Sequence, residues 1–297
     1  MNNAREGLLQ TVAVGGEPLW RAALSRFLAN RAAIVGIVLL ALITAFAFIA
    51  PMLSPHDMET NDWERIQIAP NAAQQHWFGT DANGRDLFVR VAAGARVSLA
   101  IGLITTLVSV AIGVFYGAIA GYVGGRTDQI MMRVVDVLYA LPLFFAIIIL
   151  VTVFGRNIFL VFLAIGAVEW LTIARIVRGQ TMAAKQLEYV EAARALGASP
   201  ARIILRHIVP NVVGPVIVFS TLLIPTVILV ESFLSFLGLG VQEPQTSWGL
   251  LISQGASALD TAPWLLVIPA GFLAATMFAF NFIGDGLRDA LDPKDDQ

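Results

Sequence analysis

The residues best able to do chemistry are widely scattered in this sequence. Its three histidines are His56, His76 and His207, and neither an H-E-x-x-H metal pattern nor a G-x-S-x-G nucleophile pattern occurs. The absence of cysteine removes thiol catalysis, disulfides and cysteine-based metal sites. Neither lysine, Lys185 or Lys294, follows a glycine as the lysine of a phosphate-binding loop does. We therefore expect no catalytic residue, no metal site and no cofactor held by this chain.

A polar string at residues 79–86, GTDANGRD, begins like a calcium-binding loop. In such a loop the position eleven residues after Asp81 is a bidentate glutamate, but here it is Ala92. The favoured interpretation is an Asn-Gly turn fixed by local hydrogen bonds of aspartate and arginine side chains, with calcium ligation as the weaker alternative.

Two carboxylates, Glu169 and Glu231, lie well inside apolar runs. A charge in hydrocarbon is costly, so both are expected to face the interior of a helix bundle or a wet cavity. On the predicted helix that contains Glu231, the residues of one stripe beside it are polar or bend the helix. Such a stripe is typical of a helix that lines a polar path. The same residue types form hydrogen bonds between helices, and both interpretations stay open. The pathway candidates are Glu169, Thr221, Glu231, Ser232 and Ser235.

The stretch from Leu187 to Pro210 is a charged, amphipathic insertion between two long apolar runs. Apolar residues at helical spacing predict one face of a short surface helix, and charged residues that step by three predict another. The apolar positions are Tyr189, Ala192, Ala193 and Leu196, and the charged positions are Lys185, Glu188, Glu191 and Arg194.

Signals for a sharp turn follow this first helix. Gly197 is able to take a positive φ and end the helix, and Ser199-Pro200 is typical of an N-cap followed by proline at the first helical position. A second helix over residues 201–209 is expected to stop before Pro210. The insertion is thus predicted to be helix, sharp turn, helix.

Composition indicates the elements that must hold these residues. The chain has 297 residues, of which 57% are hydrophobic and 13% charged, and its mean hydropathy is +0.76. These values exclude an ordinary soluble domain and predict an all-α polytopic membrane protein. The net charge of −2 indicates little about partners, because in membrane proteins the distribution of Lys and Arg matters more than their sum.

Six transmembrane helices are predicted from apolar runs of the length that a bilayer requires. They cover residues 32–50, 97–122, 130–154, 158–176, 212–239 and 263–283. The third run contains Pro142, where we expect a kink. In the second run Gly113, Gly117 and Gly121 are spaced by four and form a stripe that lets another helix approach closely.

The predicted spans divide the chain into segments. Residues 1–31 form a cytoplasmic amphipathic segment, 32–50 the first span and 51–95 a polar extracytoplasmic segment. Residues 96–286 form a five-helix transmembrane core that includes a cytoplasmic loop at 183–210, and residues 287–297 form a cytoplasmic tail. Fourteen of the 19 Lys and Arg residues fall on the side of the N-terminus and five on the other, so both termini and the insertion are expected in the cytoplasm.

Several strings resemble a known class of importer permease. Glu191-Ala192-Ala193, Gly197 and Ile208-Val209-Pro210 resemble the EAA signature of ABC importer permeases, with Val209 in place of the usual leucine. Longer strings are similar to the C-type permease subunit of peptide importers, particularly those for oligopeptides. They are GTDANGRD at 79–86, GGRTDQIMMRVVDVLYALP at 124–142, ARIVRGQ at 174–180, ESFLSFLGLGVQEP at 231–244, SWG at 247–249 and FNFIGDGLRDALDPK at 280–294.

This resemblance implies a type I ABC importer permease in a bacterial inner membrane, with a cytoplasmic EAA coupling-helix loop. It implies a second homologous permease subunit, two ABC ATPase subunits that bind ATP and Mg, and an extracytoplasmic peptide-binding protein. The bilayer is a further partner, and nucleic acid is not expected. The coupling residues would be Glu191, Ala192, Ala193, Arg194, Gly197 and Ser199.

Three alternatives remain at this point. The same architecture could import dipeptides, glutathione or nickel complexes instead of oligopeptides. A channel or secondary transporter would need no projecting cytoplasmic insertion, and its ion coupling would depend on Glu169 or Glu231. The insertion could also be an interfacial helix that lies on lipid headgroups.

Overall fold

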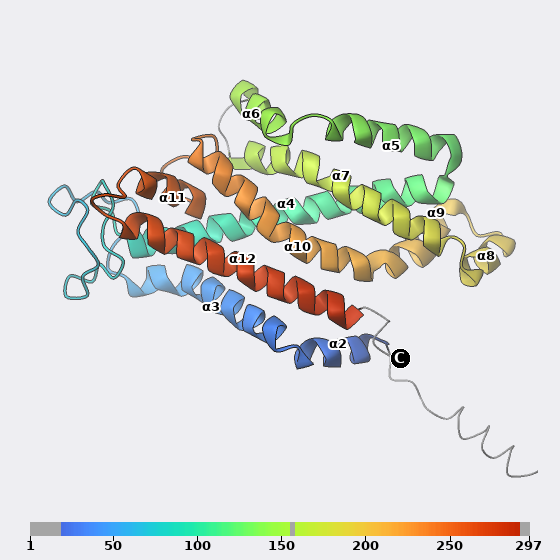
Figure 1. The fold of residues 1–297 in the computed structure, drawn as a ribbon, viewed down its shortest axis with the longest axis horizontal. Coiled ribbons are helices and arrows are strands. Elements are labelled where there is room, and N and C mark those ends of the chain that lie inside the picture. Colours follow the sequence, from blue (N-terminus) through green and yellow to red (C-terminus); the bar gives the residue numbers. More distant parts are fainter. Residues whose placement is uncertain (1–18, 155–157, 292–297) are drawn as a thin grey trace, which may run out of the picture.

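The computed structural model describes residues 19–154 and 158–291, and the regular elements there are helices that form one elongated bundle (Figure 1). In chain order they are α2 (Leu19–Ala29), α3 (Arg31–Leu53), α4 (Leu87–Val123), α5 (Gly125–Tyr139), α6 (Leu143–Phe154), α7 (Ile158–Ala184), α8 (Glu188–Ala195), α9 (Pro200–Ile203), the π-helical turn η1 (Ile204–Ile208), α10 (Val209–Phe236), α11 (Trp248–Ala256) and α12 (Trp264–Leu291).

Four helices within the described residues are long and apolar enough to cross a membrane. They are α3, α4, the continuous helix Pro200–Phe236 and α12. Even the shortest, the 23-residue α3, is about 34 Å long at 1.5 Å per residue, which exceeds the hydrocarbon thickness of a bilayer. The prediction of an all-α membrane protein is therefore confirmed, whereas the count of six spans stays a prediction.

The third predicted span is interrupted. Helix α5 has 15 residues and α6 has 12, and Ala140, Leu141 and Pro142 form a turn between them. Proline lacks an N–H and disfavours the helical conformation of the residue before it, so the chain leaves the helix at Leu141. The sequence located the irregularity correctly but predicted a kink, whereas the structure has a break.

The second helix of the insertion does not stop before Pro210, so that prediction is wrong. Helix α9 passes through η1 into α10, and the N–H of Val209 donates to the carbonyl of Ile204, five residues earlier. A π-turn adds one residue to the helical turn, and the ring and missing N–H of Pro210 fall at the start of α10. Pro210 is thereby accommodated without a break.

Two other helix boundaries differ from the predicted spans. Helix α4 begins at Leu87, ten residues before the predicted start, because Asp86 caps it by accepting from the N–H of Val89 at 3.0 Å. Helix α12 continues through the Gly284-Asp285-Gly286 string to Leu291. Both glycines are helical contact points, and a Cβ on Gly284 would lie 2.5 Å from a methyl carbon of Leu222.

The predicted glycine stripe packs α4 against α7, two helices at the centre of the bundle (Figure 1). A Cβ on Gly113 would lie 2.6 Å from Cβ of Ile173, and one on Gly117 would collide with the carbonyl oxygen of Ala174. Side chains larger than hydrogen would force the two backbones apart. The predicted close approach of another helix is thus confirmed.

The insertion and the 54–86 segment lie at opposite ends of the bundle (Figure 1). Helices α8 and α9 share one end with the start of α2 and the end of α12, where Asn30 donates to Asp289 at 3.4 Å. The other end holds residues 54–86 and α11, which is anchored by the buried Trp248 through a 3.2 Å hydrogen bond from Nε1 to the Val91 carbonyl. The insertion and the polar 54–86 segment are therefore far apart.

Candidate functional site

The insertion is seated on the bundle by one side of α8. Val190 and Ala193 are buried there and belong to a cluster of apolar side chains from α4, α7, α9, η1 and α10. The small Ala193 lets α8 lie close to these helices. A buried base of this kind gives the insertion a fixed position relative to the long helices.

Gly197 ends α8 in the predicted way. Its φ is 78°, its N–H donates to the carbonyl of Arg194 at 3.0 Å, and the N–H of Ala198 donates to the carbonyl of Ala193 at 3.1 Å. This pair of hydrogen bonds is a Schellman motif, in which glycine is favoured because a Cβ strains the left-handed conformation. The sharp turn expected from the sequence is confirmed.

The start of α9 also follows the prediction. Ser199 is the N-cap residue, and its Oγ accepts from the N–H of Arg202 at 3.4 Å. Pro200 occupies the first helical position, where no N–H is needed. Gly197 and Ser199 together fix the angle between α8 and the long helix that follows.

Three side chains fasten the insertion to neighbouring helices. Nζ of Lys185 donates to the Gly121 carbonyl at 2.9 Å, and Nδ2 of Asn211 donates to the Tyr189 hydroxyl at 2.9 Å. Arg194 lies with its guanidinium carbon 5.8 Å from the ring centre of Tyr122, close enough for a cation–π interaction. These contacts therefore join the insertion to α4 and α10.

The outer face of α8 differs from the predicted apolar face. Of the four apolar positions, only Ala193 is buried, whereas Tyr189 and Ala192 are exposed and Leu196 is 89% exposed. The buried face is instead formed by Val190 and Ala193, because that side packs into the apolar cluster formed by α4, α7, α9, η1 and α10. The apolar Leu196 thus projects from the molecule at the turn.

The Glu191 carboxylate is exposed on α8 and forms no hydrogen bond or ion pair within the described part of the chain. It lies in the first turn of the helix, where a negative charge is favoured by the helix dipole. It also lines an open depression with Tyr122, Lys185 and Arg194. The carboxylate is therefore open to a partner while cationic side chains lie on the same depression.

The comparison with known protein families decides which class of protein this is. Residues 113–295 match the family model described as binding-protein-dependent transport system inner membrane component. The chain belongs to that family. Residues 18–72 also match a model of the N-terminal transmembrane domain of oligopeptide transport permease C.

Curated relatives of this family member extend the likeness over nearly all of the chain. The oligopeptide transport system permease protein OppC of Haemophilus influenzae is 53% identical, covering 97% of this chain and 92% of the relative. The Escherichia coli K12 protein of the same name is also 53% identical, covering 98% and 96%. The dipeptide transport system permease protein DppC of Bacillus subtilis is 44% identical, covering 93% and 84%. The family resemblance expected from the sequence is confirmed, and the chain is a multi-pass membrane permease.

The pathway candidates of this transport family member fall into separate places. Glu231 is fully buried and accepts from Ser235 Oγ at 2.6 Å, and the buried Ser232 lies on the same part of α10. The Thr221 hydroxyl donates to the Ile217 carbonyl of its own helix at 2.9 Å. Glu169 lies on α7 beside the break between α5 and α6. The structure thus groups Glu231, Ser232 and Ser235, and their role in transport stays a prediction.

Two ion pairs between α5 and α7 were missed by sequence reasoning. The Arg178 guanidinium donates to both Asp128 oxygens at 2.5 and 2.6 Å, and Arg175 donates to Asp136 at 2.8 Å. One sequence feature could have pointed to these ion pairs, since both aspartates lie in the 124–142 string and both arginines lie in the 174–180 string. These strings contact each other in this permease.

At the opposite end of the permease the 79–86 string forms the predicted turn. Oδ1 of Asp81 accepts from the N–H groups of Asn83 and Arg85 at 2.8 and 2.9 Å, and Gly84 has φ 74°. Oδ2 of Asp81 accepts from the buried Arg90 and from Nε of Arg85. The expected Asn-Gly turn with local aspartate and arginine hydrogen bonds is confirmed.

Proposed function

We propose that this permease is the membrane-spanning subunit of an ATP-driven importer that takes up oligopeptides delivered by an extracytoplasmic binding protein. The observation that carries the proposal is the form of α8, which has a buried base, an exposed apolar tip and a Glu191 carboxylate with no ion pair among the described residues. Such a projection fits a groove of a soluble partner, and movement of that partner would displace the attached helices. The chain is a transport subunit in this scheme and not an enzyme.

The proposed topology has six spans with both termini in the cytoplasm of a bacterium. In Figure 1, α5 and α6 together run from the end that holds α8 toward the other end, which supports a third span made of two shorter helices. Helix α7 then returns toward α8, and α10 and α12 complete the alternation. The excess of Lys and Arg on the α8 side supports a cytoplasmic location of that end.

We assign distinct coupling roles to the residues of the insertion. Glu191 and Arg194 would orient the docked α8 by charge, and the small Ala192 would allow the partner to approach its exposed face. Ala193 seats α8 on the bundle, while Gly197 and Ser199 set the angle of the turn.

The partners follow from the same scheme. Two ATPase subunits would bind ATP and Mg, one against this chain and one against a second homologous permease subunit. Peptide would pass between the two permeases by alternating access, as in other transporters with a site near the middle of the bilayer. Glu169, Thr221, Glu231, Ser232 and Ser235 remain our candidates for that pathway.

The identity of the relatives favours oligopeptides among possible cargoes. The oligopeptide permeases of two bacteria are 53% identical to this chain, and a dipeptide permease is 44% identical. A glutathione transport system permease protein of Pectobacterium atrosepticum is 41% identical. Dipeptides, glutathione and nickel complexes remain the alternative cargoes. Binding-protein exchange would distinguish these cargoes, because the binding protein delivers the substrate.

The test is co-purification of the tagged chain with its ATPase subunits, followed by ATP hydrolysis with a loaded binding protein in lipid nanodiscs. We expect peptide to stimulate hydrolysis in the wild type. Leu196→Asp places a charge on a side chain that is 89% exposed, so we expect it to reduce ATPase recovery and leave the fold intact. The matched control is Leu205→Asp, since Leu205 is also exposed but lies on η1. Equal ATPase recovery with wild type and Leu196→Asp would contradict the docking proposal.

A further inference from the structure

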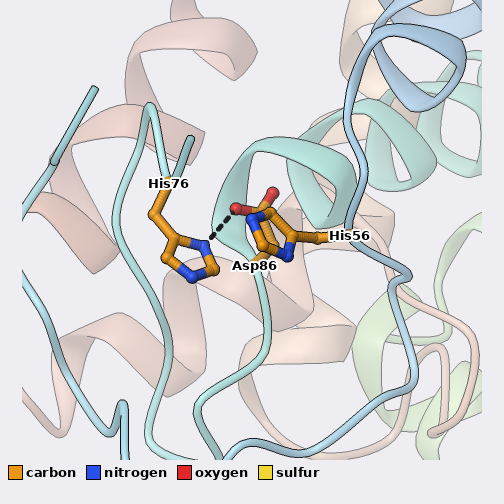
Figure 2. Close-up of side chains that lie close together, drawn as sticks. All are labelled: His56, His76 and Asp86. Carbon is orange, nitrogen blue, oxygen red and sulfur yellow. Dashed lines mark hydrogen bonds and ion pairs between the residues drawn. The ribbon is translucent and has the colours of Figure 1, made fainter. Parts of the chain in front are cut away.

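Two histidines and an aspartate meet in the segment between α3 and α4, although the sequence separates His56 from His76 by 20 residues. A ring nitrogen of each histidine and a carboxylate oxygen of Asp86 all lie within 4.8 Å of one another. Figure 2 shows the imidazole of His76 directed at the Asp86 carboxylate and the ring of His56 beside the same carboxylate. Nδ1 of His76 lies 2.8 Å from Oδ2 of Asp86.

The outward side of His56 is arranged as it is in metal-binding histidines. Its Nε2 lies 3.3 Å from the carbonyl oxygen of Gln74, and a carbonyl only accepts, so Nε2 carries a proton. The other ring nitrogen is then left with a free lone pair. Metal-binding histidines usually donate their second N–H to a carbonyl or carboxylate in this way, which fixes the ring and its tautomer.

The other two groups are buried and held by the backbone. His76 and Asp86 are each 2% exposed, an unusual burial for polar side chains in a segment with little regular structure. Two isolated bridges, Asn71 with His76 and Thr80 with Asp86, fix their backbones. Oδ1 of Asp86 is committed to the N–H of Val89 at the start of α4, so Oδ2, which now contacts His76, is the oxygen that an ion would take.

From this geometry we propose that His56, His76 and Asp86 bind a divalent transition-metal ion of the Zn²⁺ class, with water completing the coordination. Two nitrogens and one carboxylate oxygen are a ligand set that zinc accepts, whereas calcium and magnesium require oxygen ligands. On binding, each imidazole gives a nitrogen lone pair and Asp86 gives an Oδ2 lone pair. The proton on the coordinating nitrogen of His76 leaves or moves to Nε2.

Besides the hydrogen bond between His76 and Asp86, which the ion replaces, two existing contacts must change. Nη1 of Arg65 lies 3.5 Å from Nε2 of His76 and competes with a proton there. The Arg65 side chain is 43% exposed and pairs with the partly exposed Asp62 at 3.4 Å, so it has room to turn outward. The rings of His56 and His76 are stacked with centroids 4.0 Å apart and must splay to share one ion. Arg65→Met, which removes the competing cation, is therefore expected to tighten metal binding.

The ion would act as a clip for the segment 54–86. His56 follows the end of α3, His76 lies in the middle of the segment and Asp86 caps α4. The chain has no cysteine for a disulfide, and a cross-link between distant points reduces the conformational freedom of a long connection. This role is independent of the cargo and of the side of the membrane on which the segment lies.

The test uses the full-length chain with its partner subunits, purified through a tag that contains no histidine and treated with a chelator. Zn²⁺ is titrated by calorimetry, and bound metal is counted after desalting. We expect about one Zn²⁺ per chain and a higher midpoint of thermal unfolding with Zn²⁺ but not with Ca²⁺. His56→Asn and His76→Asn are expected to lose affinity by about tenfold or more, at least the effect of removing an outer partner of a ligand.

Matched controls separate metal binding from general damage. His207→Asn removes the third histidine of the sequence, which lies on η1 at the opposite end of the bundle, and is expected to bind Zn²⁺ like the wild type. His56 is partly exposed, so His56→Asn keeps the question testable if His76→Asn fails to fold. The proposal is overturned if the wild type binds no stoichiometric Zn²⁺ or if both variants bind it as tightly as the wild type.

Discussion

Arg85 and Glu243 are 158 positions apart in the sequence and are joined by a hydrogen bond of 2.8 Å from Nη2 to Oε1. Arg85 also donates from Nε to Oδ2 of Asp81 at 2.8 Å, and Gln254 donates to the same Glu243 oxygen at 2.8 Å. The guanidinium therefore connects the 79–86 turn to the polypeptide that leads into α11. Two separate strings of the sequence form one polar junction at this end of the permease.

This junction predicts a specific acid sensitivity. The hydrogen bond from Arg85 holds the pKa of Glu243 below its ordinary value of 4.5. A carboxylate with a lowered pKa stabilises the fold above its unfolded-state pKa, and this contribution is lost as the pH falls through the folded-state value. We expect the midpoint of thermal unfolding to fall further between about pH 7 and about pH 3 in the wild type than in Glu243→Gln.

Asp260→Asn serves as the control for this comparison. Asp260 is exposed near α11 and has no ion pair within the described part of the chain. On the same acidification, the thermal unfolding midpoint of Asp260→Asn is expected to fall by as much as that of the wild type. Identical losses in Glu243→Gln and the wild type would show that the junction contributes nothing to acid stability.

The packing of α4 on α7 predicts a steric effect at one glycine and not at another. A Cβ on Gly117 would collide with the Ala174 carbonyl, whereas a Cβ on Gly166 would be 3.7 Å from its nearest neighbour, a methyl of Thr105. We expect Gly117→Ala to destabilise the permease by about 1–3 kcal/mol, the usual cost of overpacking. Gly166→Ala, at the same helix interface, is expected to be neutral. Thermal unfolding in detergent measures both, and equal midpoints would contradict the close packing.

Local chemistry explains which parts of the insertion were predictable. The positive φ of Gly197, the cap at Ser199 and the 79–86 turn depend on a few neighbouring residues, so their residue types indicate them directly. The glycine stripe was predictable for a similar reason, since spacing by four fixes one face of a helix. The family strings added the class of protein.

Features that depend on distant segments were not predictable in this way. Periodicity assigned Tyr189 and Leu196 to the apolar face of α8, but an apolar cluster built from distant helices buries Val190 instead. The π-turn that carries the helix through Pro210 has no periodic signal. His56 and Asp86 lie at two ends of a segment without helical periodicity, so only the folded chain shows that they meet.

The absence of cysteine makes the proposed orientation directly testable. Leu196→Cys and Trp63→Cys place single thiols on side chains that are 89% and 68% exposed, at opposite ends of the bundle. In inside-out vesicles we expect a membrane-impermeant maleimide to label the thiol at position 196 and not the one at 63. Right-side-out cells are expected to give the reverse pattern, and the cysteine-free parent controls for background. Labelling of position 196 from outside would invert the topology.

The turn at Gly197 predicts loss of coupling without loss of insertion. No atom lies within 4 Å of a Cβ built on Gly197, so a substitution there acts only through its φ of 78°. A β-branched residue resists this conformation by about 1–2 kcal/mol, enough to shift the angle between α8 and α9. We therefore expect Gly197→Val to insert and associate with the second permease normally but to lose most peptide uptake and peptide-stimulated ATP hydrolysis.

The control for this variant is a substitution at a glycine that has as much room for a Cβ but a helical backbone. Gly271 on α12 also has no atom within 4 Å of a built Cβ, and its backbone is helical, so Gly271→Val adds the same side chain without that strain. Gly197→Asn tests the mechanism further, because asparagine tolerates the left-handed conformation better than valine and is expected to retain more uptake. The substitution acts only through the angle that the turn imposes on α8. If Gly197→Val transported peptide and bound its ATPase like the wild type, the turn would therefore have no part in coupling.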